Sequence, residues 1–143
     1  YQVPSKERQQ NIERLIHAFQ MEPHISGLIS SYSHGMKQKV ALIAAFSHNP
    51  KFLVLDEPFV GLDPEAFIAL KEQMKMLCRK RSSVLFSSHI LDVVEKLCNK
   101  ISIIKDGRLL YSGTTEELIG VEGLEEAFME LNSNERFDPS IEK

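Results

Sequence analysis

The feature that most constrains this chain is an apolar run that ends in two adjacent carboxylates. Phe52–Leu55 is continuously apolar, Asp56 and Glu57 follow directly, and Pro58 prevents simple continuation of a strand. A short apolar run between charged residues predicts a strand covered on both faces, which is typical of parallel sheets. Because ligands bind at the carboxyl ends of strands in open α/β sheets, the pattern predicts a ligand site at the two carboxylates.

The types of these residues suit a hard cation and a water nucleophile. Mg²⁺ takes carboxylate and water oxygens, and a neighbouring carboxylate can accept a proton from an attacking water molecule. The alternative is a solvated Asp–Glu pair at an ordinary junction between a strand and a loop. Burial of two charges without a function is costly, so the functional interpretation is favoured.

The residues from Ser33 onward form a second candidate site. Ser33 is a good N-cap for a helix, Gly35 lies within its first turn, and Lys37 and Lys39 add positive charge. Backbone N–H groups, the helix dipole and a hydroxyl group together favour an anion such as phosphate. An ordinary N-cap followed by a solvated basic turn explains the same residues, and both interpretations stay open here.

The pattern along the chain predicts an α/β domain. Strand, helix, strand, helix, strand is the alternation of a largely parallel sheet, whereas the helices before the first strand form a separate subdomain. Asp106-Gly107 predicts a hairpin turn, and Thr115 is expected to cap a short helix. The expected helices are 5–19, 33–47, 63–81, 91–98, one from 115 and 124–131, and the expected strands are 52–55, 84–87, 101–104 and 108–112.

Charge and cysteine content limit the function classes. The 17 basic and 20 acidic residues give a net charge of −3, which excludes a strongly basic nucleic-acid binder as the first interpretation. The two cysteines lack metal-ligand spacing and are too few for a disulfide scaffold, which favours a reducing cytosol. The dense apolar run Val40–Phe46 is far too short to span a bilayer.

Two further motifs carry little information alone. Gly61-Leu62-Asp63-Pro64 predicts a turn and then a helix that Asp63 caps. Ser87-Ser88-His89 follows the next predicted strand. A lone histidine is more often structural than catalytic, but the end of a neighbouring strand would bring His89 to the same sheet edge as the carboxylates.

In order and spacing, the four motifs together resemble the second half of the ATP-binding cassette of ABC transporters. Tyr32–Met36 matches the signature motif, and Phe52–Pro58 matches the Walker B segment with its catalytic glutamate. Gly61–Asp63 matches the D-loop, and His89 matches the switch histidine. The Tyr-Ser-x-Gly-Met-Lys-Gln form of the signature is similar to that of bacterial export-type cassettes.

The resemblance covers about residues 1–120 and implies a partial P-loop NTPase cassette of the α/β class. It implies a helical signature subdomain at 1–49 and the C-terminal half of a mainly parallel sheet core at 50–131. Residues 132–143 are expected to form a polar tail.

The resemblance also implies ATP and Mg²⁺ as cofactors and a role for each site residue. Asp56 would hold Mg²⁺ through its water shell, Glu57 would activate the attacking water, and His89 would hydrogen-bond the γ-phosphate. The remaining site residues would contact ATP bound to the opposite subunit (Ser33, His34, Gly35 and Met36) or couple the two sites (Asp63).

The chain departs from the family pattern in two respects. His34 stands where the usual signature has glycine, and Met36 stands where it has glutamine. Ser33 and Gly35 are retained, so we expect phosphate binding to survive. None of the seven glycines is followed by lysine, so the P-loop G-x-x-x-x-G-K-[ST] is missing. We therefore expect a C-terminal portion of a cassette that is inactive alone and that exposes apolar surface on its first two strands.

The function implied for the complete protein is that of an ATP-hydrolysing subunit that powers transport, in the direction of export. Its partners would be a transmembrane permease and a second cassette, with no nucleic acid, and it would lie in the cytoplasm on the inner face of the cell membrane. Two alternatives remain: a non-catalytic interaction module derived from a cassette, and a non-transport ABC ATPase.

Overall fold

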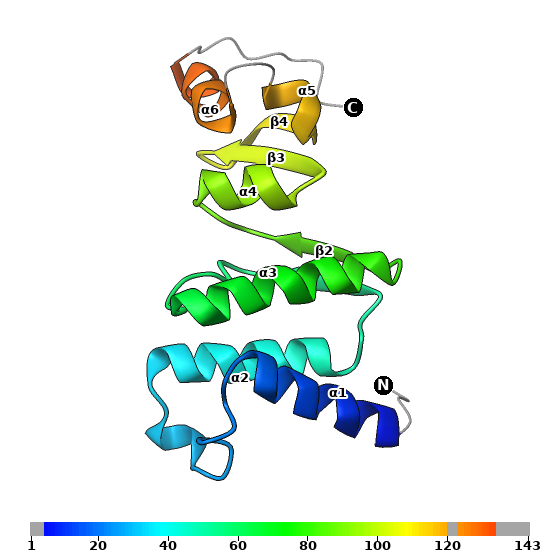
Figure 1. The fold of residues 1–143 in the computed structure, drawn as a ribbon. Helices are drawn as coiled ribbons and strands as arrows, with labels where there is room; N and C mark the ends of the chain where they lie inside the picture. Colours follow the sequence, from blue (N-terminus) through cyan, green and yellow to red (C-terminus); the bar gives the residue numbers. More distant parts are fainter. Residues whose placement is uncertain (1–4, 120–122, 134–143) are drawn as a thin grey trace. The chain divides into compact units, whose positions relative to one another are not determined.

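The computed structural model describes residues 5–119 and 123–133 (Figure 1). The described chain divides into two compact units, one within residues 1–88 and one within residues 89–143. The first contains α1 (Ser5–Ala18), the short 3-10 helix η1 (Ile29–Ser31), α2 (His34–Ser47), β1 (Phe52–Leu55), α3 (Pro64–Arg79) and β2 (Ser83–Phe86). The second contains α4 (Leu91–Leu97), β3 (Lys100–Lys105), β4 (Arg108–Thr114), α5 (Thr115–Ile119) and α6 (Leu124–Ser133). Residues 134–143 of the expected tail lie outside the described residues.

The strands β1 and β2 form a parallel pair that α3 connects. Phe52 lies opposite Ser83, and Leu55 lies opposite Phe86. The backbone N–H of Ser87 donates to the carbonyl of Leu55 over 3.0 Å, which extends the pairing one residue beyond β2. This register brings Ser87 beside the first residue after β1, which is Asp56.

The faces of this sheet differ in their exposure to solvent. Leu53 is buried, and the apolar side of α3, with Leu70 and Leu77 among its buried residues, contributes to the core. On the other face, Phe52 and Val54 are each 60% exposed and Leu85 is 57% exposed. The predicted exposure of apolar sheet surface on the first two strands is therefore confirmed, and coverage of both faces stays an expectation for a complete cassette.

The helices α1 and α2 pack against each other and share a polar link to α3. Asn11, which is buried, donates to the carbonyls of Phe46 and Ser47 over 3.1 and 2.8 Å and so caps the end of α2. Arg14 donates to Asn11 over 2.8 Å and to Gln73 on α3 over 2.6 Å. The C-terminal end of α2 is thus bonded to α1, and α1 is bonded in turn to α3.

The second unit contains the antiparallel hairpin β3–β4. Asp106 and Gly107 have φ values of 51° and 75°, which matches the predicted hairpin turn. The prediction that Thr115 caps α5 is wrong by one residue. The hydroxyl of Thr114 accepts the N–H of Glu117, and the carboxylate of Glu117 accepts the N–H of Thr114 in return. Thr115 is buried and donates to the carbonyl of Cys98.

Helix length and apolarity bear on membrane insertion. Within the described residues, none of the helices has both the length and the apolar content that crossing a bilayer demands.

Candidate functional site

The carboxylates at the end of β1 are organised by one serine. The Ser87 hydroxyl donates to Asp56 Oδ1 over 2.6 Å and accepts the backbone N–H of Glu57 over 2.8 Å. Hydrogen bonds to an ionised carboxylate are stronger than those between neutral groups. The parallel register places Ser87 next to the end of β1. The pairing of the strands therefore fixes the positions of the Asp56 carboxylate and of the Glu57 backbone N–H.

The backbone at Glu57 is held in an unusual conformation. Its φ is 41°, in the left-handed region that non-glycine residues rarely adopt. The backbone N–H of Glu57 donates a hydrogen bond to Ser87, and the next residue, Pro58, is buried. These two features hold the backbone of Glu57 in this conformation. The Oε2 atom of Glu57 is buried, whereas Asp56 is exposed. The two carboxylates therefore have different environments, which suits different chemical roles.

The carboxylate oxygens of these residues are suitable ligands for Mg²⁺. Mg²⁺ keeps several waters and is commonly bound through one or two carboxylates together with phosphates. Asp56 is exposed and fixed in orientation by Ser87, so a hydrated cation can approach it. Among residues 5–119 and 123–133, no group of three or more His, Cys, Asp or Glu residues could form a metal cage. The site fits a shared Mg²⁺ that also contacts phosphate.

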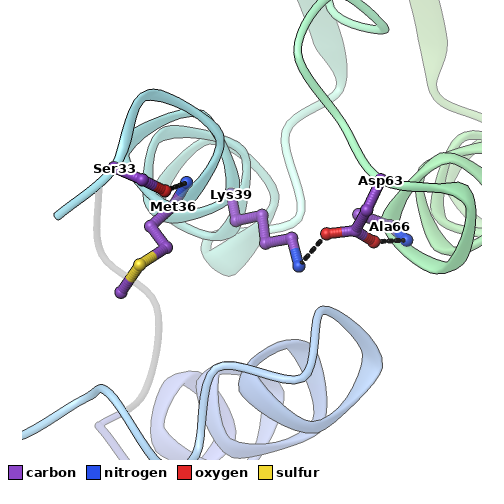
Figure 2. Close-up of polar contacts among 5 residues, drawn as sticks. All are labelled: Ser33, Met36, Lys39, Asp63 and Ala66. Atoms are coloured by element: carbon purple, nitrogen blue, oxygen red, sulfur yellow. Dashed lines mark hydrogen bonds and ion pairs between the residues drawn. The ribbon is translucent and has the colours of Figure 1, made fainter.

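The start of α2 has the predicted cap. Ser33 is in an extended conformation, and its Oγ atom accepts the N–H of Met36 over 3.2 Å (Figure 2). Ser33 and His34 are exposed, and Gly35 and Met36 are partly exposed. The first turn of α2 therefore presents a hydroxyl group and the positive end of the helix dipole to solvent.

The start of α2 packs closely against the segment that follows Glu57. A Cβ atom at Gly35 would lie 2.8 Å from the carbonyl oxygen of Gly61, a distance that real Cβ contacts do not show. Gly61 has φ 76°, and a Cβ atom there would lie 3.0 Å from the ring of His34. Gln38 adds a hydrogen bond of 3.3 Å to the carbonyl of Pro58. The signature and D-loop segments are therefore in direct contact within one chain. Because they approach so closely, glycine is required at both positions of this contact.

Asp63 uses both of its carboxylate oxygens within the chain. Oδ1 accepts the N–H of Ala66 over 2.9 Å and caps α3, as predicted, and Oδ2 forms an ion pair of 2.5 Å with Lys39 (Figure 2). The Lys39 ammonium group, followed by the Ala66 N–H, lowers the pKa of Asp63. The Lys39 side chain is only 13% exposed, whereas that of Asp63 is 44% exposed.

All but one of the predicted site residues lie in the first unit. The signature residues, Asp56, Glu57 and Asp63 all lie in the first unit. His89 is exposed and begins the second unit, so its contact with the γ-phosphate stays a prediction.

Neither the hydrogen bonds of Ser87 nor the ion pair of Lys39 with Asp63 was predicted from the sequence. The signal for Ser87 was present, because a hydroxyl residue directly after the neighbouring parallel strand reaches the same sheet edge. No local signal pairs Lys39 with Asp63, because that contact depends on how α2 packs.

Comparisons with known proteins find a matching family model, relatives and a solved structure. The family model described as "AAA domain, putative AbiEii toxin, Type IV TA system" matches residues 13–95. The chain is 35% identical over 130 residues to the ABC-type transporter ATP-binding protein EcsA of Bacillus subtilis, covering 91% of this chain and 53% of EcsA. It is 29% identical over 119 residues to the Nod factor export ATP-binding protein I of Rhizobium meliloti, covering 83% of this chain and 36% of that protein.

A solved structure agrees with these relatives. The structure titled "Structure of ATP binding subunit of ABC transporter" superposes with a TM-score of 0.87 at 34% identity, covering 92% of this chain and 57% of that chain. The chain thus spans between 36% and 57% of the length of these three proteins.

Proposed function

Because the chain belongs to the family of ABC transporter ATP-binding proteins, we propose that it supplies the magnesium, water and partner-ATP contacts of an ATPase cassette that powers transport. The observation that carries this proposal is the carboxylate pair at the end of β1. One residue of the pair is exposed and the other has a buried oxygen, and Ser87 contacts both.

Each carboxylate takes the role that its environment favours. Asp56, exposed and oriented by Ser87, would hold Mg²⁺ through its water shell, and the cation would supply positive charge to neutralise the ATP phosphates. Glu57 accepts the proton of the attacking water, and the fixed backbone at this residue sets the direction from which it acts. His89 is proposed to hydrogen-bond the γ-phosphate.

The start of α2 is proposed to bind the γ-phosphate of ATP held by a second cassette. The Ser33 oxygen accepts the N–H of Met36, and its hydroxyl hydrogen remains able to donate to a phosphate oxygen. Gly35 lets the helix start approach Gly61, and His34 lies against that same glycine. Because Ser33 and His34 are exposed, this surface can meet a second molecule.

The partners and location follow from this role. We assign the chain to a cassette pair that drives a transmembrane permease, located in the cytoplasm and peripheral on the inner face of the membrane. The signature form and the relative named for Nod factor export support transport in the export direction. The isolated chain lacks a P-loop lysine motif, so titration calorimetry with Mg-ATP should detect no micromolar affinity.

The experiment that tests the proposal replaces Glu57 in a complete cassette, in which this chain is joined to a P-loop-bearing N-terminal half. Glu57→Gln keeps the shape of the side chain but removes the proton acceptor, so ATP turnover should fall about 10²–10⁴-fold while ATP binding is retained. The matched control is Glu65→Gln, at an exposed glutamate in the first turn of α3. Near-normal turnover in Glu57→Gln would instead mean that another group activates the water.

A further inference from the structure

We propose that Lys39 is a positioning residue that fixes the segment between Glu57 and Asp63 against the start of α2. The proposal rests on the proposed function only for its consequence in catalysis, because the contacts themselves need no nucleotide. It concerns the first unit alone.

The two carboxylate oxygens of Asp63 make separate contacts. Its Oδ1 atom caps α3 through the N–H of Ala66, which is all that an N-cap requires. The Oδ2 atom contacts a residue of another helix, Lys39, over 2.5 Å (Figure 2). Removing the charge of Asp63 while keeping a capping oxygen therefore separates the two roles.

The contacts that α2 makes with this segment lie on one face of the helix. Gly35, Gln38 and Lys39 are spaced i, i+3 and i+4, so they share one face of the helix. They contact three points of a single segment, in turn the carbonyl of Gly61, the carbonyl of Pro58 and the carboxylate of Asp63. This face of α2 holds the segment along its length.

The segment from Glu57 to Asp63 is fixed at both of its ends. Ser87 holds the N–H of Glu57 at one end, and Lys39 holds Asp63 at the other. Between them, the N–H groups of Val60 and Leu62 bond to the carbonyls of Glu57 and Phe59 over 3.2 and 3.4 Å. A lysine that is 13% exposed loses most of its side-chain freedom, which is costly unless its ammonium group is bound. The ion pair is thus the distal anchor of the segment that begins at the catalytic glutamate.

The test is amide hydrogen exchange of the full 143-residue chain, read at Val60 and Leu62. Lys39→Met removes the charge and keeps the length of the side chain, and exchange at both amides should become about three- to fivefold faster. Lys39→Arg should restore slow exchange. Lys37→Met, at an exposed lysine on the same helix, is the matched control and should leave the rates unchanged.

A second arm uses the partner residue. Asp63→Asn retains a capping oxygen for Ala66 but loses the ion pair, so it should speed exchange by the same factor as Lys39→Met. The double variant should be no faster than either single variant. Unchanged rates in Lys39→Met, or additive effects in the double variant, would overturn the proposal. If Lys39→Met does not fold, the exchange rates of Asp63→Asn test the proposal alone.

The consequence for catalysis is measured separately. In the complete cassette, Lys39→Met should lower kcat with little change in the KM for ATP, and Lys39→Arg should recover kcat. The exchange measurement contains no nucleotide. Failure of the proposed function would therefore appear in Glu57→Gln, and failure of this inference would appear in the exchange rates.

Discussion

Replacing Ser87 by alanine should reveal how much the carboxylate pair depends on one hydroxyl group. Its Oγ atom donates to Asp56 over 2.6 Å and accepts the N–H of Glu57 over 2.8 Å. Glu57 has φ 41°, and a non-glycine residue in this region costs about 1–3 kcal/mol, which the surrounding contacts must offset. Ser87→Ala removes one of those contacts.

The magnitude follows from the two hydrogen bonds. A bond to a charged group contributes about 1.5–3 kcal/mol and a bond between neutral groups about 0.5–1.5 kcal/mol. Asp56 and Ser87 are exposed, so water replaces part of what is lost. We therefore expect the free energy of unfolding of the chain to fall by about 1–2 kcal/mol, which is less than the roughly 2–4.5 kcal/mol that the two ranges give together.

The assay is urea denaturation followed by circular dichroism at low protein concentration. Ser87→Thr keeps the hydroxyl group and should recover most of the stability. Ser83→Ala, at an exposed serine that begins β2, is the matched control and should change stability by no more than about 0.5 kcal/mol. A loss in Ser87→Ala no larger than that in Ser83→Ala would refute the role of Ser87 as organiser of the pair.

Three other predictions concern stability and association. The ion pair with Lys39 lowers the pKa of Asp63 from its ordinary 3.8, so the charged carboxylate stabilises the fold above that pH, and this stability is lost as the pH falls below it. Asp63→Asn should accordingly show a smaller drop in unfolding free energy between about pH 5 and about pH 3 than the wild type, whereas an equal drop would assign the acid sensitivity to other groups. Asn11→Ala leaves two carbonyls at the end of α2 without their donor. It should lower the unfolding free energy, measured by urea titration, by about 2–3 kcal/mol. A loss below about 0.5 kcal/mol would show that water replaces the cap. Val54→Thr with Leu85→Thr, an exposed cross-strand pair, should reduce self-association in light scattering, and unchanged scattering would place the association elsewhere.

The elements of the fold could be predicted where local chemistry decides them. Asp63-Pro64 gave the start of α3, Ser33 gave the cap of α2, and Asp106-Gly107 gave the hairpin turn, because each signal acts within a few residues. At Thr114, two adjacent threonines offered the same cap, and the reciprocal bond with Glu117 selected the first. Local signals thus predicted the kind of each element better than its first residue.

The organisation of the candidate site could be predicted only in part. Asp56 and Glu57 stand out because charge directly follows an apolar strand. Ser87 joins them only through the register of a parallel pair, and the contact of Lys39 with Asp63 exists only because α2 packs beside that segment. Apolar content predicted burial of both sheet faces, but burial depends on what packs there, and the described chain leaves Val54 exposed.

We propose that the chain serves two ATP sites, its own through Glu57 and that of the partner cassette through Ser33. The most direct test is the ATPase rate of heterodimers of the complete cassette that carry Ser33→Arg and Glu57→Gln. With both changes in one subunit, Glu57→Gln disables that subunit's own site and the arginine blocks the partner's site, so both are lost. With one change in each subunit, both lesions fall in one composite site, the other site stays whole, and the rate should be clearly higher. An equal or lower rate in the split pair would contradict the claim that Ser33 acts on the partner's nucleotide.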